Sequence, residues 1–261
     1  MKKGKRISFG LGVGALLLLA SCNKLLEMTE QGRDDRVVSK SVPQKYRIKT
    51  MSAWHPTDST IAYFNYNEAG DPTSIIFSHT TTGRLNGFFR YQQNRQLRDY
   101  FVMYDSSHFE HWWRYVYDSS GRVIQDTLYQ MGVVGPDGPL QNQTLLVSDY
   151  TYDRYGRVAR TNTHVLIPNT GGRFERTYEY DIRGNLVPGD FVYQYDSKIS
   201  IFRTHDVWQL VNKNFSRNNL FLVDEYNEAG LPTQFHMQDE FVYFHFLQHN
   251  IPGARIKVTY E

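Results

Sequence analysis

The sequence predicts an all-β protein, an antiparallel meander of β-hairpins that curves into an open sheet or a partial barrel. Tyrosine (19 residues) and phenylalanine (16 residues) are abundant, and aromatic side chains favour strands over helices. A short motif of tyrosine, Asp or Asn, two variable residues and glycine recurs along the chain. Strand-like stretches such as Arg122-Val123-Ile124 follow the glycine, as expected for the second strand of a hairpin.

The motif occurs often enough to define a repeat. Independent placement of the same residues would yield roughly 0.2 copies, so an internal repeat is the better account. Full copies begin at Tyr66, Tyr117, Tyr152, Tyr180 and Tyr226, and degenerate copies begin at Tyr91 and Tyr195.

Each position of the motif has a mechanical role in a hairpin tip. Asp or Asn opens a type I turn by bonding to the backbone two residues on, and glycine supplies the left-handed conformation that closes the loop. In four copies a second aromatic residue lies two positions before the tyrosine, which places both rings on one face of the strand. These residues are Phe64, Tyr115, Tyr150 and Tyr178.

The best-formed copies resemble a known family. They are Tyr117-Asp118-Ser119-Ser120-Gly121-Arg122-Val123, Tyr152-Asp153-Arg154-Tyr155-Gly156-Arg157-Val158 and Tyr180-Asp181-Ile182-Arg183-Gly184-Asn185-Leu186. They are similar to the tyrosine-aspartate (YD) repeats of the RHS family, and more closely to the YD-like repeats of small lipoproteins from Bacteroidota. The resemblance implies stacked β-hairpins. Large RHS proteins enclose a toxin, but this chain has neither their length nor a toxin segment, so that function is not transferred.

The N-terminus resembles a bacterial lipoprotein signal. A basic segment is followed by an apolar stretch, residues 7–20, too short to span a bilayer as a helix. Leu19-Ala20-Ser21-Cys22 then forms a lipid-attachment box. The resemblance implies a diacylglyceryl thioether on Cys22, cleavage before it, and a fatty acyl chain such as palmitate on the new amino terminus. An ordinary cleaved signal that happens to contain a cysteine is the alternative.

These features divide the chain into three parts. We expect a signal peptide over residues 1–21, a lipidated Cys22 with a flexible tether over residues 22–43, and a β domain over residues 44–261. The charged tether has no sustained apolar period, although it could instead supply a first strand or helix. Asn23 in place of an aspartate after Cys22 indicates the outer membrane by the sorting rule of enteric bacteria. The periplasmic side and the cell surface both remain open.

Two segments interrupt the repeats. Residues 131–143 contain Gly-Pro pairs and predict a long mobile hairpin loop. Residues 204–212 predict a short helix with Thr204 as its N-cap. Both are expected outside the repeat core, and the last strands are expected over residues 241–246 and 255–260.

The sequence offers no recognisable catalytic or cofactor chemistry. It lacks a Gly-x-Ser-x-Gly elbow and a phosphate loop. His245 with His249, and His108 with His111, are too far apart along a strand to share an ion. The net charge of +2 includes the basic signal, so nucleic acid is not an expected partner. We therefore expect no catalytic residue, metal or cofactor, and membrane attachment through Cys22.

Trp112 and Trp113 are the candidate ligand-binding residues. Adjacent residues on a strand point to opposite faces, so one ring of the pair is a candidate for exposure, and exposed rings stack sugars. Alternatively, one ring is core and the other covers a neighbouring hairpin. Trp54 and Trp208 have the same ambiguity. These observations favour a non-enzymatic envelope lipoprotein acting as an interaction or scaffold module on a protein partner; a glycan-binding accessory protein is the alternative.

Overall fold

The computed structural model describes residues 46–55, 58–81, 83–103, 107–167, 171–187, 194–236 and 254–261. The chain divides into two compact units, Met1–Lys40 and Ser41–Glu261, and every described residue belongs to the second. The expected signal peptide, Cys22, the tether and the strand at 241–246 lie outside the described residues and stay predictions. Within the described ranges, no helix is long and apolar enough to cross a membrane.

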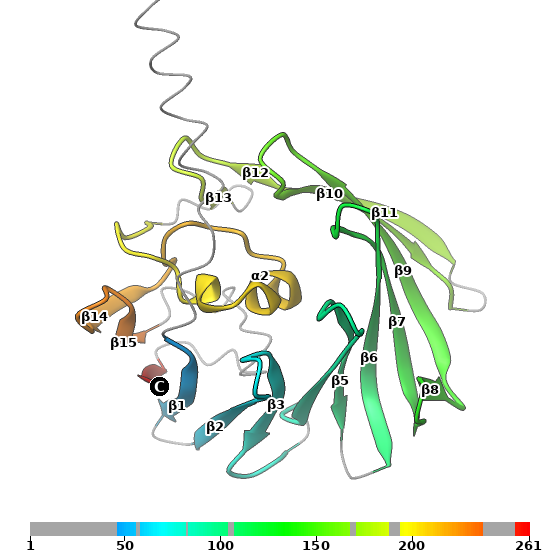
Figure 1. The fold of residues 1–261 in the computed structure, drawn as a ribbon, viewed down its shortest axis with the longest axis horizontal. Helices are drawn as coiled ribbons and strands as arrows, with labels where there is room; N and C mark the ends of the chain where they lie inside the picture. Colours follow the sequence, from blue (N-terminus) through cyan, green and yellow to red (C-terminus); the bar gives the residue numbers. More distant parts are fainter. Residues whose placement is uncertain are drawn as a thin grey trace, which may run out of the picture. The chain divides into compact units, whose positions relative to one another are not determined.

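The expected all-β meander is confirmed. One open, curved, antiparallel sheet contains almost every strand, in the order β11-β10-β9-β7-β6-β5-β4-β3-β2-β1-β16-β15-β14, with β8 beside β7 (Figure 1). The strands of the first half are β1 (Ile48–His55), β2 (Asp58–Tyr66), β3 (Pro72–Phe77), β4 (Asn86–Tyr91), β5 (Leu97–Met103), β6 (His108–Tyr117) and β7 (Val123–Val134). Those of the second half are β8 (Pro139–Leu140), β9 (Gln143–Tyr152), β10 (Val158–Val165), β11 (Gly172–Thr177), β14 (Leu222–Tyr226), β15 (Pro232–His236) and β16 (Arg255–Tyr260).

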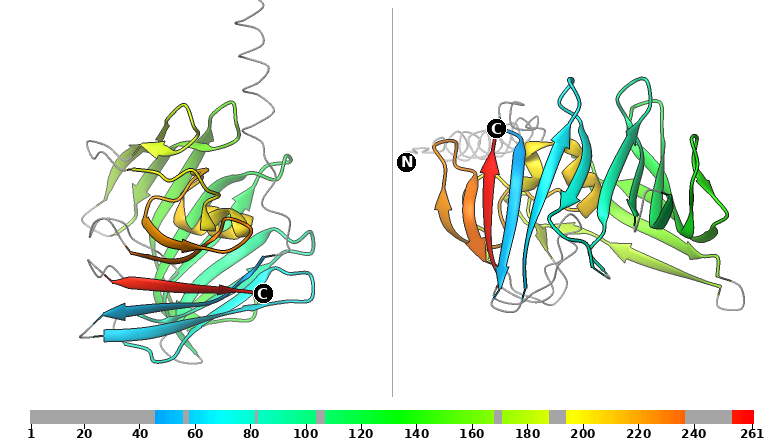
Figure 2. Two further views of the ribbon diagram at one scale, coloured as in Figure 1. Left: turned by 90° about the vertical axis from the view of Figure 1, so that its left-hand side faces the viewer. Right: turned by 90° about the horizontal axis from the view of Figure 1, so that it is seen from below.

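The C-terminal strand extends the sheet beyond the first strand. β16 pairs with β1 on one side and with β15 on the other, so β1 lies inside the sheet (Figure 2). Between β11 and β14 the chain leaves the sheet. It forms a two-stranded ribbon of β12 (Glu179–Tyr180) and β13 (Leu186–Val187), the 3-10 turn η1 (Ile201–Thr204) and the helix α2 (Asp206–Asn212).

The repeat glycines form the hairpin tips as predicted. All five have a left-handed φ between 72° and 86°. At one tip, Asp118 Oδ1 accepts the backbone N–H groups of Ser120 and Arg122, each at 2.9 Å. The degenerate copy that begins at Tyr91 keeps the backbone hydrogen bonds of the turn, Gln92 N to Gln96 O and Arg95 N to Gln92 O. It does so without glycine, because Arg95 takes the left-handed position with φ 66°.

The repeat tyrosines link each hairpin to its neighbour. Except at Tyr226, whose hydroxyl donates to Asp196 Oδ2 at 2.7 Å, each hydroxyl donates to a backbone carbonyl near the start of a strand in the adjacent unit, and Tyr260 at the end of β16 does the same. Burial raises the pKa of most of these phenols, so they stay protonated donors. The pairs are Tyr66 to Ile48, Tyr91 to Pro72, Tyr117 to Leu97, Tyr152 to Val123, Tyr180 to Val158, Tyr195 to Leu186 and Tyr260 to Pro232, at 2.6 to 3.1 Å.

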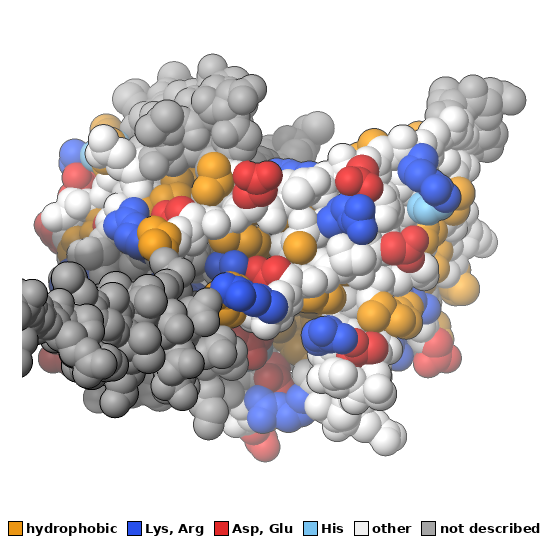
Figure 3. Space-filling view, turned by 90° about the horizontal axis from the view of Figure 1, so that it is seen from above, with side chains coloured by type: hydrophobic (Ala, Val, Ile, Leu, Met, Phe, Trp, Pro, Cys, Tyr) orange, Lys and Arg blue, Asp and Glu red, His pale blue; other side chains and the backbone are white. Residues whose placement is uncertain are grey.

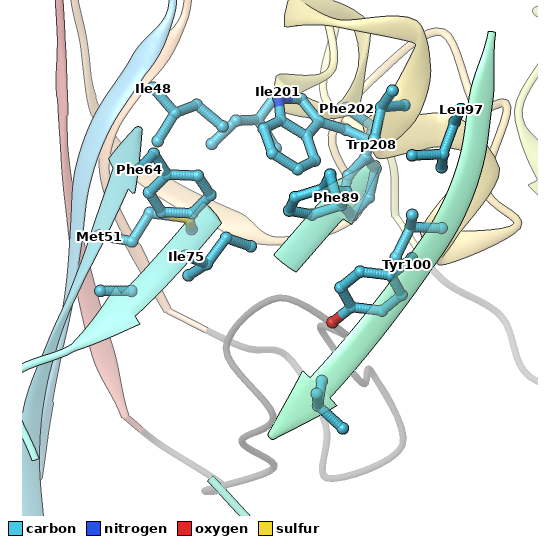
Figure 4. Close-up of a cluster of buried hydrophobic side chains, with 14 of the residues drawn as sticks. Ile48, Met51, Phe64, Ile75, Phe89, Leu97, Tyr100, Ile201, Phe202 and Trp208 are labelled. Atoms are coloured by element: carbon cyan, nitrogen blue, oxygen red, sulfur yellow. The ribbon is translucent and has the colours of Figure 1, made fainter. Parts of the chain in front are cut away.

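Helix α2 belongs to the main core, which corrects the expectation that it lies outside the repeats. It sits on the concave side of the sheet (Figure 1). Trp208 is fully buried, and its ring lies edge-on to Phe64 at 5.5 Å and to Phe89 at 5.6 Å (Figure 4). The N-cap is His205 rather than Thr204, because His205 Nδ1 accepts the N–H of Val207. The Thr204 hydroxyl donates instead to Ile201 O within η1.

The segment at 131–143 is not the mobile loop that its Gly-Pro pairs predict. Strand β7 continues to Val134, and β8 pairs with it. Two arginines of the sheet donate to carbonyls of the connecting turn: Arg90 Nη1 to Gly135 O at 2.8 Å, and Arg114 Nη2 to Asp137 O at 2.8 Å. These bonds fix the turn against the sheet.

Candidate functional site

The two adjacent tryptophans point to opposite faces, as predicted. Trp112 has 0% exposure, stacks on Phe101 at 4.2 Å and donates its Nε1–H to Asp99 Oδ1 at 2.9 Å. It belongs to a small second core on the face opposite to α2. Its ring is therefore inaccessible to a ligand, so only one of the two candidate residues remains available.

Trp113 is half-buried on the concave face, where it belongs to a row of stacked rings and also lies 5.6 Å from the His111 ring. Its ring lies 5.3 Å from that of Tyr100 with an interplanar angle of 16°, and Tyr100 stacks in turn on Phe89 at 4.9 Å. Strands β4, β5 and β6 contribute one ring each. The row gives Trp113 a fixed orientation at the edge of the aromatic core.

Beyond Trp113 one transverse row of the concave face is polar. Strand register aligns Asp126 of β7, Ser148 of β9 and Thr163 of β10 in one transverse row. All three are buried, with Asp126 only 2% exposed. The hydroxyls of Ser148 and Thr163 lie 3.0 Å apart and hydrogen-bond to each other. A polar floor thus lies where the other strands carry core side chains.

Trp113 and the two hydroxyl residues of the polar floor, Ser148 and Thr163, line a cavity of about 200 Å³. We call it the Trp113 pocket. Aromatic rings, hydroxyls and two basic side chains line it: Tyr100, Trp113, Tyr115, Leu146, Ser148, Thr161, Thr163, Phe174, Arg176, Tyr178, Val211 and Lys213.

A buried carboxylate supports one side of the pocket. Asp126 Oδ2 accepts a hydrogen bond from the Tyr150 hydroxyl and lies 3.2 Å from Lys213 Nζ. Burial, together with the charge of Asp126, raises the pKa of Tyr150 well above its usual value, so Tyr150 is a protonated donor. Lys213 is the C-cap of α2 and adopts a left-handed φ of 48°. The end of the helix therefore aims an ammonium group at the sheet.

A second cavity, of about 550 Å³, lies among the hairpin tips and the start of α2. Its two arginines are paired within the protein: Arg95 forms hydrogen bonds to Asp71 through two nitrogens at 2.7 and 2.9 Å, and Arg122 forms one to Asp118. Burial lowers the pKa of His205, which keeps this N-cap neutral. Arg95, Arg122 and His205 therefore have structural roles.

Seen from above, basic and acidic side chains are interspersed over the described surface (Figure 3).

The remaining candidates are placed as follows. Trp208 is core, whereas Trp54 is 62% exposed on strand β1. Within the described ranges, no three His, Cys, Asp or Glu side chains lie close enough to hold a metal ion. His245 and His249 lie outside those ranges.

The sequence indicates Trp113 as a candidate, but it does not indicate the polar floor beside the cavity. Asp126, Ser148 and Thr163 occupy inward positions of their strands, where an alternating pattern predicts apolar side chains. That polar substitution is a signal in the sequence. The sequence does not show that these three residues form one polar floor. That arrangement depends on the register of three strands and on Lys213, at the end of a helix far along the chain.

Comparison with known proteins gives distant structural similarity only. No family model and no curated protein matches the chain. A crystal structure of TcdB2-TccC3-TEV is similar over 71% of this chain, with 16% identity and a TM-score of 0.30, and the matched region covers 9% of that chain. A porin-like protein from Bacteroides vulgatus has 12% identity and a TM-score of 0.39, covering 82% of this chain and 98% of that one. Another, from Bacteroides uniformis, has 10% identity and a TM-score of 0.30, covering 85% and 99%.

Proposed function

We propose that this chain is a non-enzymatic lipoprotein of the cell envelope that acts as a binding module, with its ligand in the Trp113 pocket. One observation carries the proposal: a half-buried tryptophan, fixed by ring stacking, borders a cavity with a floor of hydroxyl groups. Concave pockets that combine an apolar wall with a few convergent polar groups are the usual form of ligand sites.

The groups in the pocket favour binding over catalysis. Nucleophilic catalysis needs a hydroxyl beside a base, whereas the hydroxyls of Ser148 and Thr163 form a hydrogen bond with each other. The charge of Asp126 is opposed by Lys213, and its Oδ2 accepts from Tyr150. A carboxylate held in this way contributes to the rigidity of the site.

The envelope location rests on the residues around Cys22. Two or more acyl chains give lasting attachment to a membrane, and Asn23 favours the outer membrane. The periplasmic side and the cell surface imply different ligands, so labelling of intact cells with a membrane-impermeant reagent is the experiment that separates them.

Glycan binding as a surface accessory protein is the favoured form of this function. Tryptophan supplies a rigid apolar face with a polar edge, and the neighbouring hydroxyls match those of a sugar. A protein partner held on the sheet surface is the other form.

Glycan and peptide arrays test both forms. The chain from residue 23 onward, Trp113→Ala and Trp54→Ala would be applied in parallel. We expect saturable binding that Trp113→Ala abolishes and Trp54→Ala, a change of an exposed ring on another surface, preserves. Binding that depends on Trp54 and not on Trp113 would contradict the proposed site, and turnover of a bound ligand would contradict the non-enzymatic role.

A further inference from the structure

The lining of the Trp113 pocket carries positive charge without negative charge. Arg176 and Lys213 face it, and no Asp or Glu is among its lining residues. Arg176 is exposed, has no acidic partner among the described residues, and lies 5.1 Å from the Tyr178 ring centre. Its neighbour Glu175 pairs instead with Arg160, at 3.5 Å. One guanidinium at the pocket is thus available to an anion.

The second cation is only partly neutralised. Lys213 Nζ lies 3.2 Å from Asp126 Oδ2, and its side chain is 30% exposed. An ammonium group has three donors, so this contact leaves donors for a ligand. Because Asp126 is buried beneath the lining, a ligand would meet the ammonium group rather than the carboxylate.

The strand register places these groups around the polar floor. Thr161 of β10 is opposite Arg176 of β11, and Thr163 is opposite Phe174. The hydroxyl floor therefore continues to the guanidinium on the edge strand, while Trp113 forms another wall of the same cavity. A sugar ring against Trp113 can direct its hydroxyls to the floor and a charged substituent to Arg176.

We propose that the Trp113 pocket binds a carboxylated sugar, such as a uronic acid unit of an acidic polysaccharide. The proposal rests on the proposed function and specifies its ligand class. Arginine binds carboxylates through two parallel hydrogen bonds, which selects a planar anionic group. At about 200 Å³ the cavity is smaller than the roughly 300 to 1,000 Å³ of typical drug-sized sites, so it admits a single sugar unit.

Titration calorimetry on the full chain, in a detergent without a sugar headgroup, tests this. The probes are trigalacturonate and its fully methyl-esterified form, which has the same rings without the charge. Arg176→Gln removes the proposed anion contact. Arg173→Gln is the matched control, because residue 173 is on the same strand but alternates to the other face.

We expect trigalacturonate to bind at least about tenfold more tightly than its ester, a difference of about 1.4 kcal/mol. Arg176→Gln should remove that difference, Arg173→Gln should keep it, and Trp113→Ala should weaken both probes. Equal binding of acid and ester through Trp113 would overturn the inference while leaving the proposed function intact. Equal effects of the two arginine variants would also overturn it, as would failure of both probes to bind; the arrays test the proposed function separately.

Discussion

The hydroxyl of Tyr152 donates a 2.6 Å hydrogen bond to the carbonyl oxygen of Val123, at the start of a strand in the preceding hairpin. The same relationship links Tyr117 to Leu97 and Tyr180 to Val158. A repeat tyrosine therefore shapes its own hairpin and fastens it to the one before. This double role explains why tyrosine rather than phenylalanine begins these copies of the motif.

Tyr152→Phe should lower the free energy of unfolding by about 0.5 to 1.5 kcal/mol, because it removes this bond and keeps the ring. Burial raises the pKa of Tyr152 to about 12, so the donor is intact at neutral pH. Tyr63→Phe is the control, since Tyr63 is exposed. Urea denaturation measures both variants, and equal midpoints would contradict the linking role.

The repeat was predictable because its chemistry is local. Turn formation needs only an Asp or Asn, a glycine and the intervening residues, and each is visible in the sequence. The copy at Tyr91 departs from the motif because Gln92 stands in place of Asp or Asn, and because Arg95, not glycine, occupies the left-handed position. Tyr260 was missed because its partner, Pro232, belongs to a pairing that depends on how β16 joins the sheet.

Two glycines should be intolerant of substitution for different reasons. Gly121→Val should cost about 1 to 2 kcal/mol, because the residue has φ 83°. Gly135→Val should also destabilise the fold, although residues 131–143 predict a mobile loop, because an added Cβ would lie 2.5 Å from Gly138 O. Gly171→Val is the control, as its Cβ would meet Val165 O at 3.6 Å. Thermal melts should separate the first two from the third.

Arg95→Met should change how the free energy of unfolding depends on pH in the acidic range. Burial alone raises the pKa of Asp71, but the hydrogen bonds and charge of Arg95 outweigh it and hold the pKa below its usual value. A depressed carboxyl pKa adds stability above the unfolded pKa of about 3.9, and this stability is lost as pH falls through the folded pKa.

The variant should therefore be less stable at neutral pH and approach the unsubstituted protein at the lowest pH. The measurement is urea denaturation at a series of pH values between neutral and strongly acidic. A constant difference across the whole range would show that Arg95 acts through packing rather than through the charge of Asp71.

Trp208→Ala should cost about 3 to 5 kcal/mol, the usual range for removing a buried aromatic side chain. Trp54→Ala, at an exposed position, should change stability by no more than about 0.5 kcal/mol. Similar melting temperatures for the two variants would contradict the placement of α2 in the core.

Cys22→Ser should leave an unprocessed precursor without lipid, while the β domain still folds. Cys22 is the single cysteine of the chain and lies outside the compact unit Ser41–Glu261. Metabolic labelling with a radioactive fatty acid measures the first part, and protease resistance of the domain measures the second. Label on the variant would contradict the lipid assignment.

The candidate site was only half predictable. Alternation along a strand identified Trp112 and Trp113 as opposite-facing rings, but it could not say which ring faced an open cavity. Which ring faces the cavity depends on tertiary packing. The turn between β7 and β8, held by Arg90 and Arg114, lies against the sheet, and Lys213 reaches Asp126 from the end of α2. Neither contact follows from local sequence.

The most direct measurement of the central claim is a crystal structure of the protein with the tightest-binding compound from the arrays. We expect an intact ligand stacked on the Trp113 ring, with polar contacts to the floor residues Ser148 and Thr163. A ligand bound at Trp54 on strand β1, or a cleaved ligand in the pocket, would contradict it.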